Sequence, residues 1–343
     1  MASIEENKIG KIRGTYQEKR SGKTYRIARQ RRLKRWKDSK DFFVVPKGYV
    51  HNIVNLSAPI NFSFIEYTND VLEYLKVGRE NLKNHNAIRF DVSKIEYFTP
   101  EVIPLLISHI KEISFNNKVP IHGNAPENEK FRQIFTQSGL YNYVKSKKKY
   151  KIAENNLLHK EANFKVKPDI AARSVEMIIK NCNCNQEYVE PIYNIFIELM
   201  SNTHHHANLK QYGYSKWWLY VFHDETTKKI SLSFLDLGVG IFKSMIVRTY
   251  LKKIGRSLKL VDNVGLVSDL LSGKVQSRID IDNEIRGKGI PQIVEYSKLE
   301  CFEKFLLITN DVKIDLKTDK TEKLTSNLRG TFYYIEFKNY NHE

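Results

Sequence analysis

The residues best suited to chemistry lie on one predicted helix, within the segment 190–208. Glu198, Asn202 and His206 are spaced at i, i+4 and i+8, so a carboxylate, an amide and an imidazole share one stripe of that helix. A carboxylate can orient or deprotonate a water, and an amide oxygen can ligate Mg²⁺. The pattern favours a metal–phosphate site, whereas the alternative is a solvated polar face. A neighbouring apolar stripe predicts burial: Ile192, Ile195, Phe196, Leu199 and Met200.

Glycine-containing motifs follow this helix at three places. A predicted strand over 231–235 runs into Asp236-Leu-Gly238-Val-Gly240. Further along are the segment Gly287-Lys288-Gly289 and a Gly330-Thr331 turn that enters the last predicted strand. A single Asp-x-Gly-x-Gly could be an ordinary turn, but motifs in this order and spacing are far more specific.

The four motifs together resemble the nucleotide-binding domain of the GHKL ATPases, which include DNA gyrase, histidine kinases, mismatch-repair ATPases and anti-sigma-factor kinases. Glu198, Asn202 and His206-Ala207 resemble the N-box of the anti-sigma-factor kinase branch. The resemblance covers residues 166–343 and implies a Bergerat-fold α/β sandwich, in which a mixed sheet has helices on one face. It also implies ATP and Mg²⁺ as ligands.

The resemblance gives each matching residue an expected role. Glu198 is the expected general base, Asn202 the expected Mg²⁺ ligand, and His206 a residue near the phosphates. Metal binding by His204, His205 and His206 together is rejected, because consecutive helical residues point about 100° apart.

The glycine motifs match the adenine and phosphate positions of the family. Asp236 is expected to accept from the adenine amine, with support from Thr331, while Gly238 and Gly240 allow close backbone approach. The phosphate-side loop is expected from Gly287, Lys288 and Gly289. Residues 242–289 are expected to form the ATP lid.

Residues 47–145 alternate between strand and helix patterns, which predicts an α/β fold. The strand end Phe90-Asp91-Val92-Ser93 and the later Ser138-Gly139-Leu140 resemble a STAS domain, the fold of anti-sigma-factor antagonists. That family carries a phosphorylated serine in the following turn. Here Thr99 is the nearby hydroxyl apart from Tyr97, and helix N-capping is the alternative role for Thr99.

Composition sets the remaining expectations. The chain has 343 residues, enough for two domains, and a net charge of +17. Residues 1–46 are expected to form a basic arm and 146–165 a Lys-rich linker. No apolar run is long enough to span a bilayer and no signal peptide is recognised, so a cytoplasmic protein with Cys182, Cys184 and Cys301 as thiols is expected.

The function expected from these features is a Mg-ATP-dependent regulatory switch acting through its lid and the STAS-like domain. ATP hydrolysis and protein Ser/Thr phosphorylation use the same motifs, so both stay open, and a protein partner or a homodimer is expected. The alternative is a nucleic-acid-associated ATPase, in which residues 8–40 bind phosphates non-specifically.

Overall fold

The computed structural model describes most of the chain beyond residue 52. The predicted basic arm, 1–46, lies outside the described residues, as does most of the predicted lid. Described residues are 53–83, 87–117, 121–143, 150–162, 166–182, 184–206, 216–246, 262–273, 276–277 and 289–340. Among these, no helix is both long and apolar enough to cross a membrane.

The first unit is a small α/β fold around a three-stranded sheet of order β1-β3-β5. Its pairings are parallel, and helices connect the strands, as parallel pairing requires. Gly139, with φ +82°, follows the C-cap of α4, as is common at helix ends. The elements are β1 (Ile53–Ser57), β2 (Asn61–Phe62), α2 (Thr68–Lys83), β3 (Ala87–Asp91), β4 (Tyr97–Phe98), α3 (Val102–Asn117), β5 (Ile121–Gly123), α4 (Glu129–Gln137) and α5 (Leu140–Tyr143).

The second unit is built on a five-stranded sheet of order β11-β12-β8-β7-β6. Its elements outside that sheet are α6 (Pro168–Cys182), η1 (Gln186–Tyr188), α7 (Val189–His206), α9 (Ile241–Ser244), β9 (Met245–Ile246), η2 (Val264–Leu266), α11 (Val267–Leu271), β10 (Gln276–Ser277) and α12 (Gly289–Ser297). The strands of the sheet are β6 (Asn156–Ala162), β7 (Lys216–Asp224), β8 (Lys229–Asp236), β11 (Phe302–Asp315) and β12 (Lys320–Phe337).

The α/β class is confirmed, but two expectations about the sheet are wrong. All four pairings among its five described strands are antiparallel, so the sheet is not mixed there. The physical reason is connectivity, because β7–β8 and β11–β12 are hairpins joined by short turns. The expected linker, 146–165, also contains strand β6, which pairs with β7 along its whole length.

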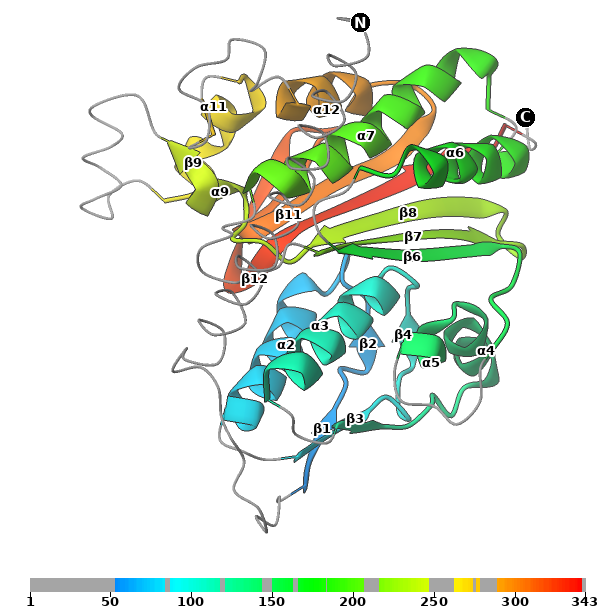
Figure 1. The fold of residues 1–343 in the computed structure, drawn as a ribbon, viewed down its shortest axis with the longest axis vertical. Helices are drawn as coiled ribbons and strands as arrows, with labels where there is room; N and C mark the ends of the chain where they lie inside the picture. The colour runs from blue at the N-terminus through cyan, green and yellow to red at the C-terminus, as the bar shows by residue number, and fades with distance from the viewer. Residues whose placement is uncertain are drawn as a thin grey trace, which may run out of the picture.

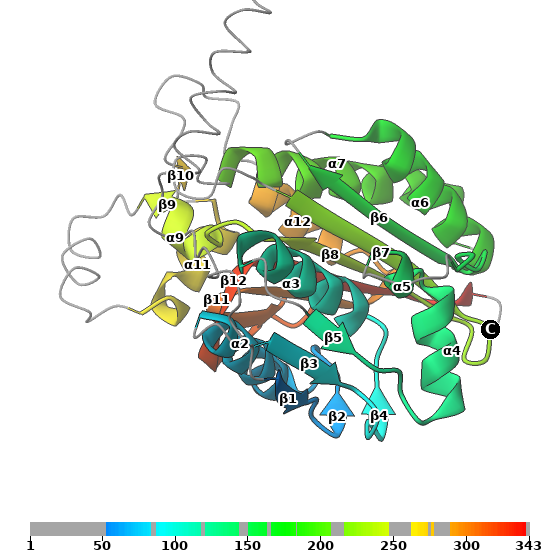
Figure 2. The same cartoon turned by 60° about the horizontal axis from the view of Figure 1, so that its bottom comes forward.

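Both faces of the five-stranded sheet are covered (Figures 1 and 2). Helices α6, α7 and α12 lie on one face, and the first unit lies on the other with α2 and α3 against the sheet. Strand β7 shows the alternation directly: Trp217 packs in the core on the helical side, while Trp218 packs in the core shared with the first unit. The two units therefore share one hydrophobic core.

Specific contacts join the first unit to strands β11 and β12. The Phe64 and Phe332 rings meet edge to face with centroids 4.9 Å apart, and Lys313 Nζ donates to the Ile65 carbonyl at 2.7 Å. Glu101, which is buried, fixes the 63–65 segment by accepting from the Phe64 N–H at 3.0 Å. The same carboxylate oxygen accepts from Ser63 Oγ, Ile65 N and Thr99 Oγ1.

The structure pairs two of the three cysteines. The structure joins Cys182 and Cys184 in a disulfide, so the expectation of free thiols is wrong for this pair, whereas Cys301 is free and buried.

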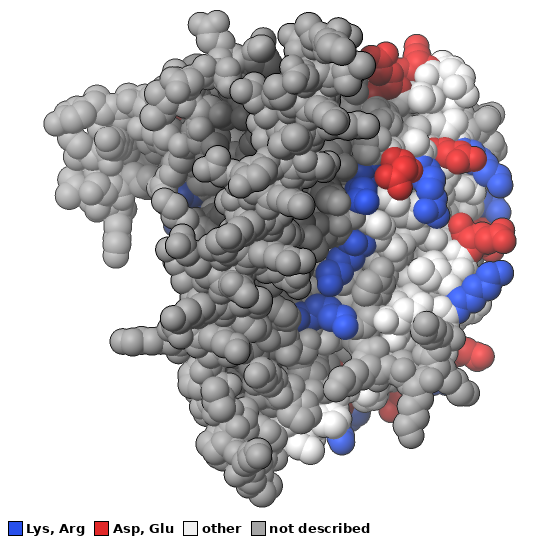
Figure 3. Space-filling model, viewed as in Figure 1, with Lys and Arg blue, Asp and Glu red and all other residues white. Residues whose placement is uncertain are grey.

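Residues 1–52 hold 15 Lys and Arg against 5 Asp and Glu. On the face in Figure 3 the described basic and acidic side chains are interspersed. Much of the positive charge therefore lies in the arm, outside the described residues.

Candidate nucleotide site

Helix α7 places the predicted polar stripe at the border of the core. All five residues of its apolar stripe are at most 1% exposed. Their burial fixes the rotation of the helix, and Glu198 and Asn202, one turn apart, are left half-buried. His206 lies in the last turn of α7, but its side chain is not among those that the structure describes.

Gly289, the first residue of α12, lies against these two side chains. A Cβ added at Gly289 would be 2.5 Å from Glu198 Oε2 and 3.1 Å from Asn202 Oδ1. Any larger residue would therefore have to displace the carboxylate. The structure thus brings together Glu198, Asn202 and Gly289, which are about ninety positions apart in the sequence. Gly287 and Lys288 lie outside the described residues.

The surroundings of α7 affect the pKa of Glu198 and the hydrogen bonding of Asn202. Burial raises the pKa of Glu198 above its ordinary value. Asn202 Nδ2 is buried without a hydrogen-bond partner among the described residues. A buried amide ordinarily has partners, and its oxygen and nitrogen can exchange places by rotation. These two groups therefore have the capacity to bind a polar ligand.

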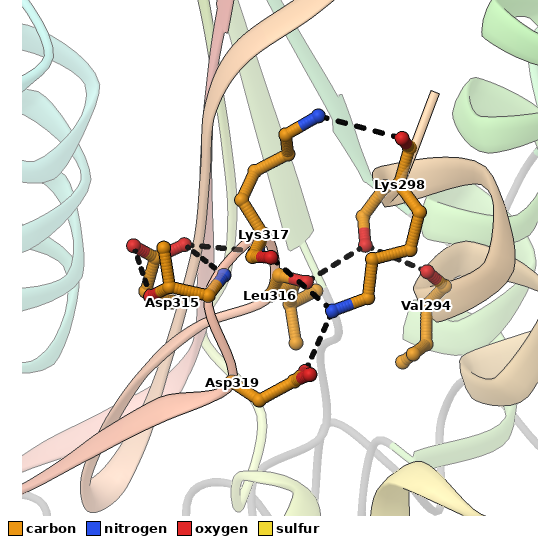
Figure 4. A network of polar contacts seen from close by, with 8 residues as sticks. Val294, Lys298, Asp315, Leu316, Lys317 and Asp319 are labelled. Atoms are coloured by element: carbon orange, nitrogen blue, oxygen red, sulfur yellow. Dashed lines mark hydrogen bonds and ion pairs between the residues drawn. The ribbon is translucent and has the colours of Figure 1, made fainter. Parts of the chain in front are cut away.

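The far end of α12 is fixed to the turn between β11 and β12 (Figure 4). Ser297 Oγ lies 3.2 Å from the Leu316 carbonyl, and Lys298 Nζ donates to Asp319 Oδ1 at 2.8 Å. From the turn, Lys317 Nζ donates to the Leu299 carbonyl at 2.9 Å. These bonds satisfy carbonyl groups beyond the helix end and hold α12 in place, so they also set the position of Gly289.

The second group of predicted residues gathers where β8 ends. Asp236 is paired with Thr331 of β12 in the sheet register, and its Oδ1 accepts from the Gly238 N–H at 2.7 Å. Burial raises the pKa of Asp236 to about 6, against the effect of hydrogen bonds from Gly238 and Thr331. Gly330 has φ +111°, and a Cβ there would lie 1.9 Å from the Asp236 carbonyl oxygen. Only glycine permits this approach of β12 to β8.

The loop that follows Asp236 is held by two residues that the sequence did not single out. Thr309 Oγ1 accepts from the Ile241 N–H at 2.9 Å, and Asn310 Oδ1 accepts from the Phe242 N–H at 3.1 Å. Both residues are fully buried and lie 68 positions from their partners. Their one sequence signal is a pair of polar residues that directly follows the apolar run 305–308.

The two groups lie toward one end of the five-stranded sheet. The last turns of α7 and the short helix α9, which follows the glycine loop, are at the same end of the sheet in Figures 1 and 2. The described residues contain no cluster of three or more His, Cys, Asp or Glu that could hold a metal.

Comparison of the chain with protein-family models gives no match. Comparison with curated proteins gives none either.

Proposed function

We propose that residues 166–340 bind Mg-ATP as a GHKL-type nucleotide-binding domain of the anti-sigma-factor kinase branch. The observation that carries the proposal is the meeting of Glu198, Asn202 and Gly289, since three predicted motif residues from two helices lie in direct contact.

The donor set suits Mg²⁺ bound together with a phosphate ligand. Asn202 supplies one amide group with an unused hydrogen-bonding atom, and Mg²⁺ typically takes few protein ligands while substrate phosphates and waters complete its shell. When bound, the ion would neutralise phosphate charge and polarise the phosphoryl oxygens. Gly289 lets the Glu198 and Asn202 side chains lie close to the first turn of α12. Helix α12 also presents its N-terminus there, an end that favours anions.

Asp236 supplies the group expected to select adenine. Its carboxylate accepts hydrogen bonds, and the exocyclic amine of adenine donates where the corresponding carbonyl of guanine cannot. Thr331 lies opposite in the sheet register and supports the same carboxylate. The half-buried position of Asp236 makes an unpaired charge costly, so a donor from a ligand would be stabilising.

Glu198 supplies the group expected to accept a proton. Its raised pKa moves the carboxylate toward the basicity that general-base catalysis near neutral pH requires. The proton would come from the attacking water in an ATPase or from a protein hydroxyl in a kinase.

The first unit supplies the regulatory half of the proposal, as a STAS-like domain on the same polypeptide. Support comes from its contacts with β11 and β12, which include the Lys313 to Ile65 hydrogen bond and a 3.0 Å bond from Ser326 Oγ to Glu73. Strand β12 also carries Thr331, so a change in the ATP site has a direct structural route to the first unit.

The test is Mg²⁺-dependent ATP binding and turnover with γ-labelled ATP, on the unaltered chain, Glu198→Ala and Asp236→Asn. Asp236→Asn is expected to lose binding, whereas Glu198→Ala keeps binding and loses turnover. Label retained on the protein identifies a kinase, and label released only as phosphate identifies an ATPase. Absence of ATP binding by the unaltered chain would refute the proposal.

A further inference from the structure

We propose that Asn310 is a positioning residue that sets the conformation of the glycine loop 238–242 for nucleotide binding. Its amide joins the two sides of this loop through hydrogen bonds to the backbone. The inference rests on the proposed ATP site and adds a residue outside the motifs that define it.

Asn310 bends strand β11 at the point where the glycine loop crosses it. Its φ is +55°, in the left-handed region, and it is 0% exposed. The pairing of β11 with β12 shifts register on both sides of Asn310. Asparagine tolerates this backbone conformation better than most residues, but glycine would adopt it more easily still. The backbone alone therefore does not explain the asparagine side chain.

The amide of Asn310 is used at both of its ends. Oδ1 accepts from the Phe242 N–H at 3.1 Å, and Nδ2 donates to the Val239 carbonyl at 3.0 Å. These two backbone groups flank Gly240, so one planar side chain fixes the separation of the residues before and after that glycine. A side-chain amide can donate from its nitrogen and accept at its oxygen at the same time, at two points in one plane.

Gly240 and Asn310 are complementary in shape as well as in hydrogen bonding. Gly240 has φ +83°, and a Cβ added there would lie 2.5 Å from Asn310 Nδ2. The space that the glycine leaves is therefore occupied by the Asn310 amide. Gly240 is predicted to allow the close approach of a ligand. On this side of the loop it allows the close approach of the Asn310 side chain.

Thr309 extends the same support to the other strand of the site. Its hydroxyl accepts from the Ile241 N–H at 2.9 Å and donates to the Gly330 carbonyl at 3.1 Å. Gly330 directly precedes Thr331, the partner of Asp236 in the register. Consecutive residues of β11 thus hold the loop that follows Asp236 and the Gly330 position within β12, which are the two sides of the proposed adenine position.

The experiment is calorimetric titration with Mg-ATP, well below the unfolding temperature, which gives the dissociation constant and the number of sites. Asn310→Gly keeps the left-handed backbone and removes both hydrogen bonds. Asn310→Asp keeps the acceptor for Phe242 and loses the donor to Val239. Lys228→Gly is the matched control, because Lys228 also has a positive φ, +58°, but lies exposed in the β7–β8 turn.

Asn310→Gly is expected to weaken ATP binding about tenfold or more while the number of sites stays near that of the unaltered chain. Asn310→Asp places a carboxylate oxygen against the Val239 carbonyl in a fully buried position and is also expected to weaken binding, whereas Lys228→Gly is expected to leave it unchanged. A merely structural role would lower the number of competent sites without changing the dissociation constant, and that result would overturn the inference. If Asn310→Gly does not fold, an unchanged constant in Asn310→Asp overturns it instead. Lack of binding by the unaltered chain would refute the proposed function and this inference together.

Discussion

Gly289 lies so close to Glu198 that a single methyl group added at residue 289 would disrupt their contact. The distance from a Cβ built on Gly289 to Glu198 Oε2 would be 2.5 Å, shorter than side chains tolerate. The group that would have to move is the free end of a flexible carboxylate and not the backbone. A substitution at Gly289 would therefore redirect the carboxylate of Glu198, the proposed general base, without affecting the stability of the fold.

Gly289→Ala is expected to lower ATP turnover on the order of 100-fold, because displacing a catalytic group by about 1 Å costs that much. The free energy of unfolding should change by less than about 1 kcal/mol, since alanine favours a helix more than glycine does. Steady-state kinetics and denaturant unfolding measure the two effects. Gly123→Ala is the control, because its nearest contact would be an ordinary 3.5 Å to the Phe90 carbonyl. Unchanged turnover in Gly289→Ala would contradict the assignment of Glu198.

Glu198 is expected to give the acidic limb of the pH–rate profile. Its pKa is raised by burial, and a general base must be deprotonated, so turnover should rise with pH through a midpoint above the ordinary glutamate value. Glu198→Gln should lower turnover by about 100-fold or more, remove this limb and leave ATP affinity nearly unchanged. Profiles of kcat measured with saturating ATP test this. A limb that persists in Glu198→Gln would assign the base to another residue.

Asp236→Asn is expected to stabilise the protein at pH 8 while it abolishes ATP binding. The folded pKa of about 6 is above the ordinary value of 3.8. The contribution of Asp236 is therefore fully favourable below pH 4 and is lost as pH rises through 6. Above pH 6 the buried charge costs about 2 kcal/mol, discounted for partial exposure, and asparagine avoids this cost.

Thermal unfolding of both proteins at pH 4.5 and pH 8 tests this expectation. The stabilisation by Asp236→Asn should be large at pH 8 and shrink toward zero at the lower pH. A gain of equal size at both values would mean that the charge of Asp236 is not the cause.

The sequence predicted helix α7 and its buried stripe well because both depend on local spacing. An i, i+4 relation and a neighbouring apolar stripe determine which side chains share a border of the core, and both are visible in one segment. The position of Asp236 could also be recognised from the sequence, because this residue ends a strand and precedes two glycines. The turn chemistry there is local.

Asn310, strand β6 and the shared core could not be predicted in the same way. The role of Asn310 depends on a register shift between β11 and β12 and on a loop 68 positions away. Strand β6 lies in a Lys-rich segment and is specified by its partner β7. The run Trp217-Trp-Leu-Tyr-Val-Phe222 did carry a signal, since a strand that is apolar in both phases is typical of a sheet buried on both faces.

Phe64→Ala is expected to destabilise both units by about 3 to 5 kcal/mol, because it removes a fully buried ring from the shared core. Trp217 and Trp218 lie in the second unit, so their fluorescence reports a change made in the first. The fluorescence transition in urea should shift to lower concentration and stay single. Tyr67→Ala, at a ring that is 38% exposed, is the control. An unshifted tryptophan transition would show that the units unfold independently.

The shared core also constrains how the chain acquires its structure during synthesis. The hydrogen bond from Lys313 to Ile65 joins residues 248 positions apart, and Phe64 packs on Phe332. At ribosomal rates the apolar surface of the first unit would wait roughly 10 to 50 seconds for strands β11 and β12 to emerge. Such a surface is prone to aggregate until it is covered, and contacts this distant in sequence form slowly. The nascent chain is therefore expected to depend on chaperones until strands β11 and β12 have emerged from the ribosome.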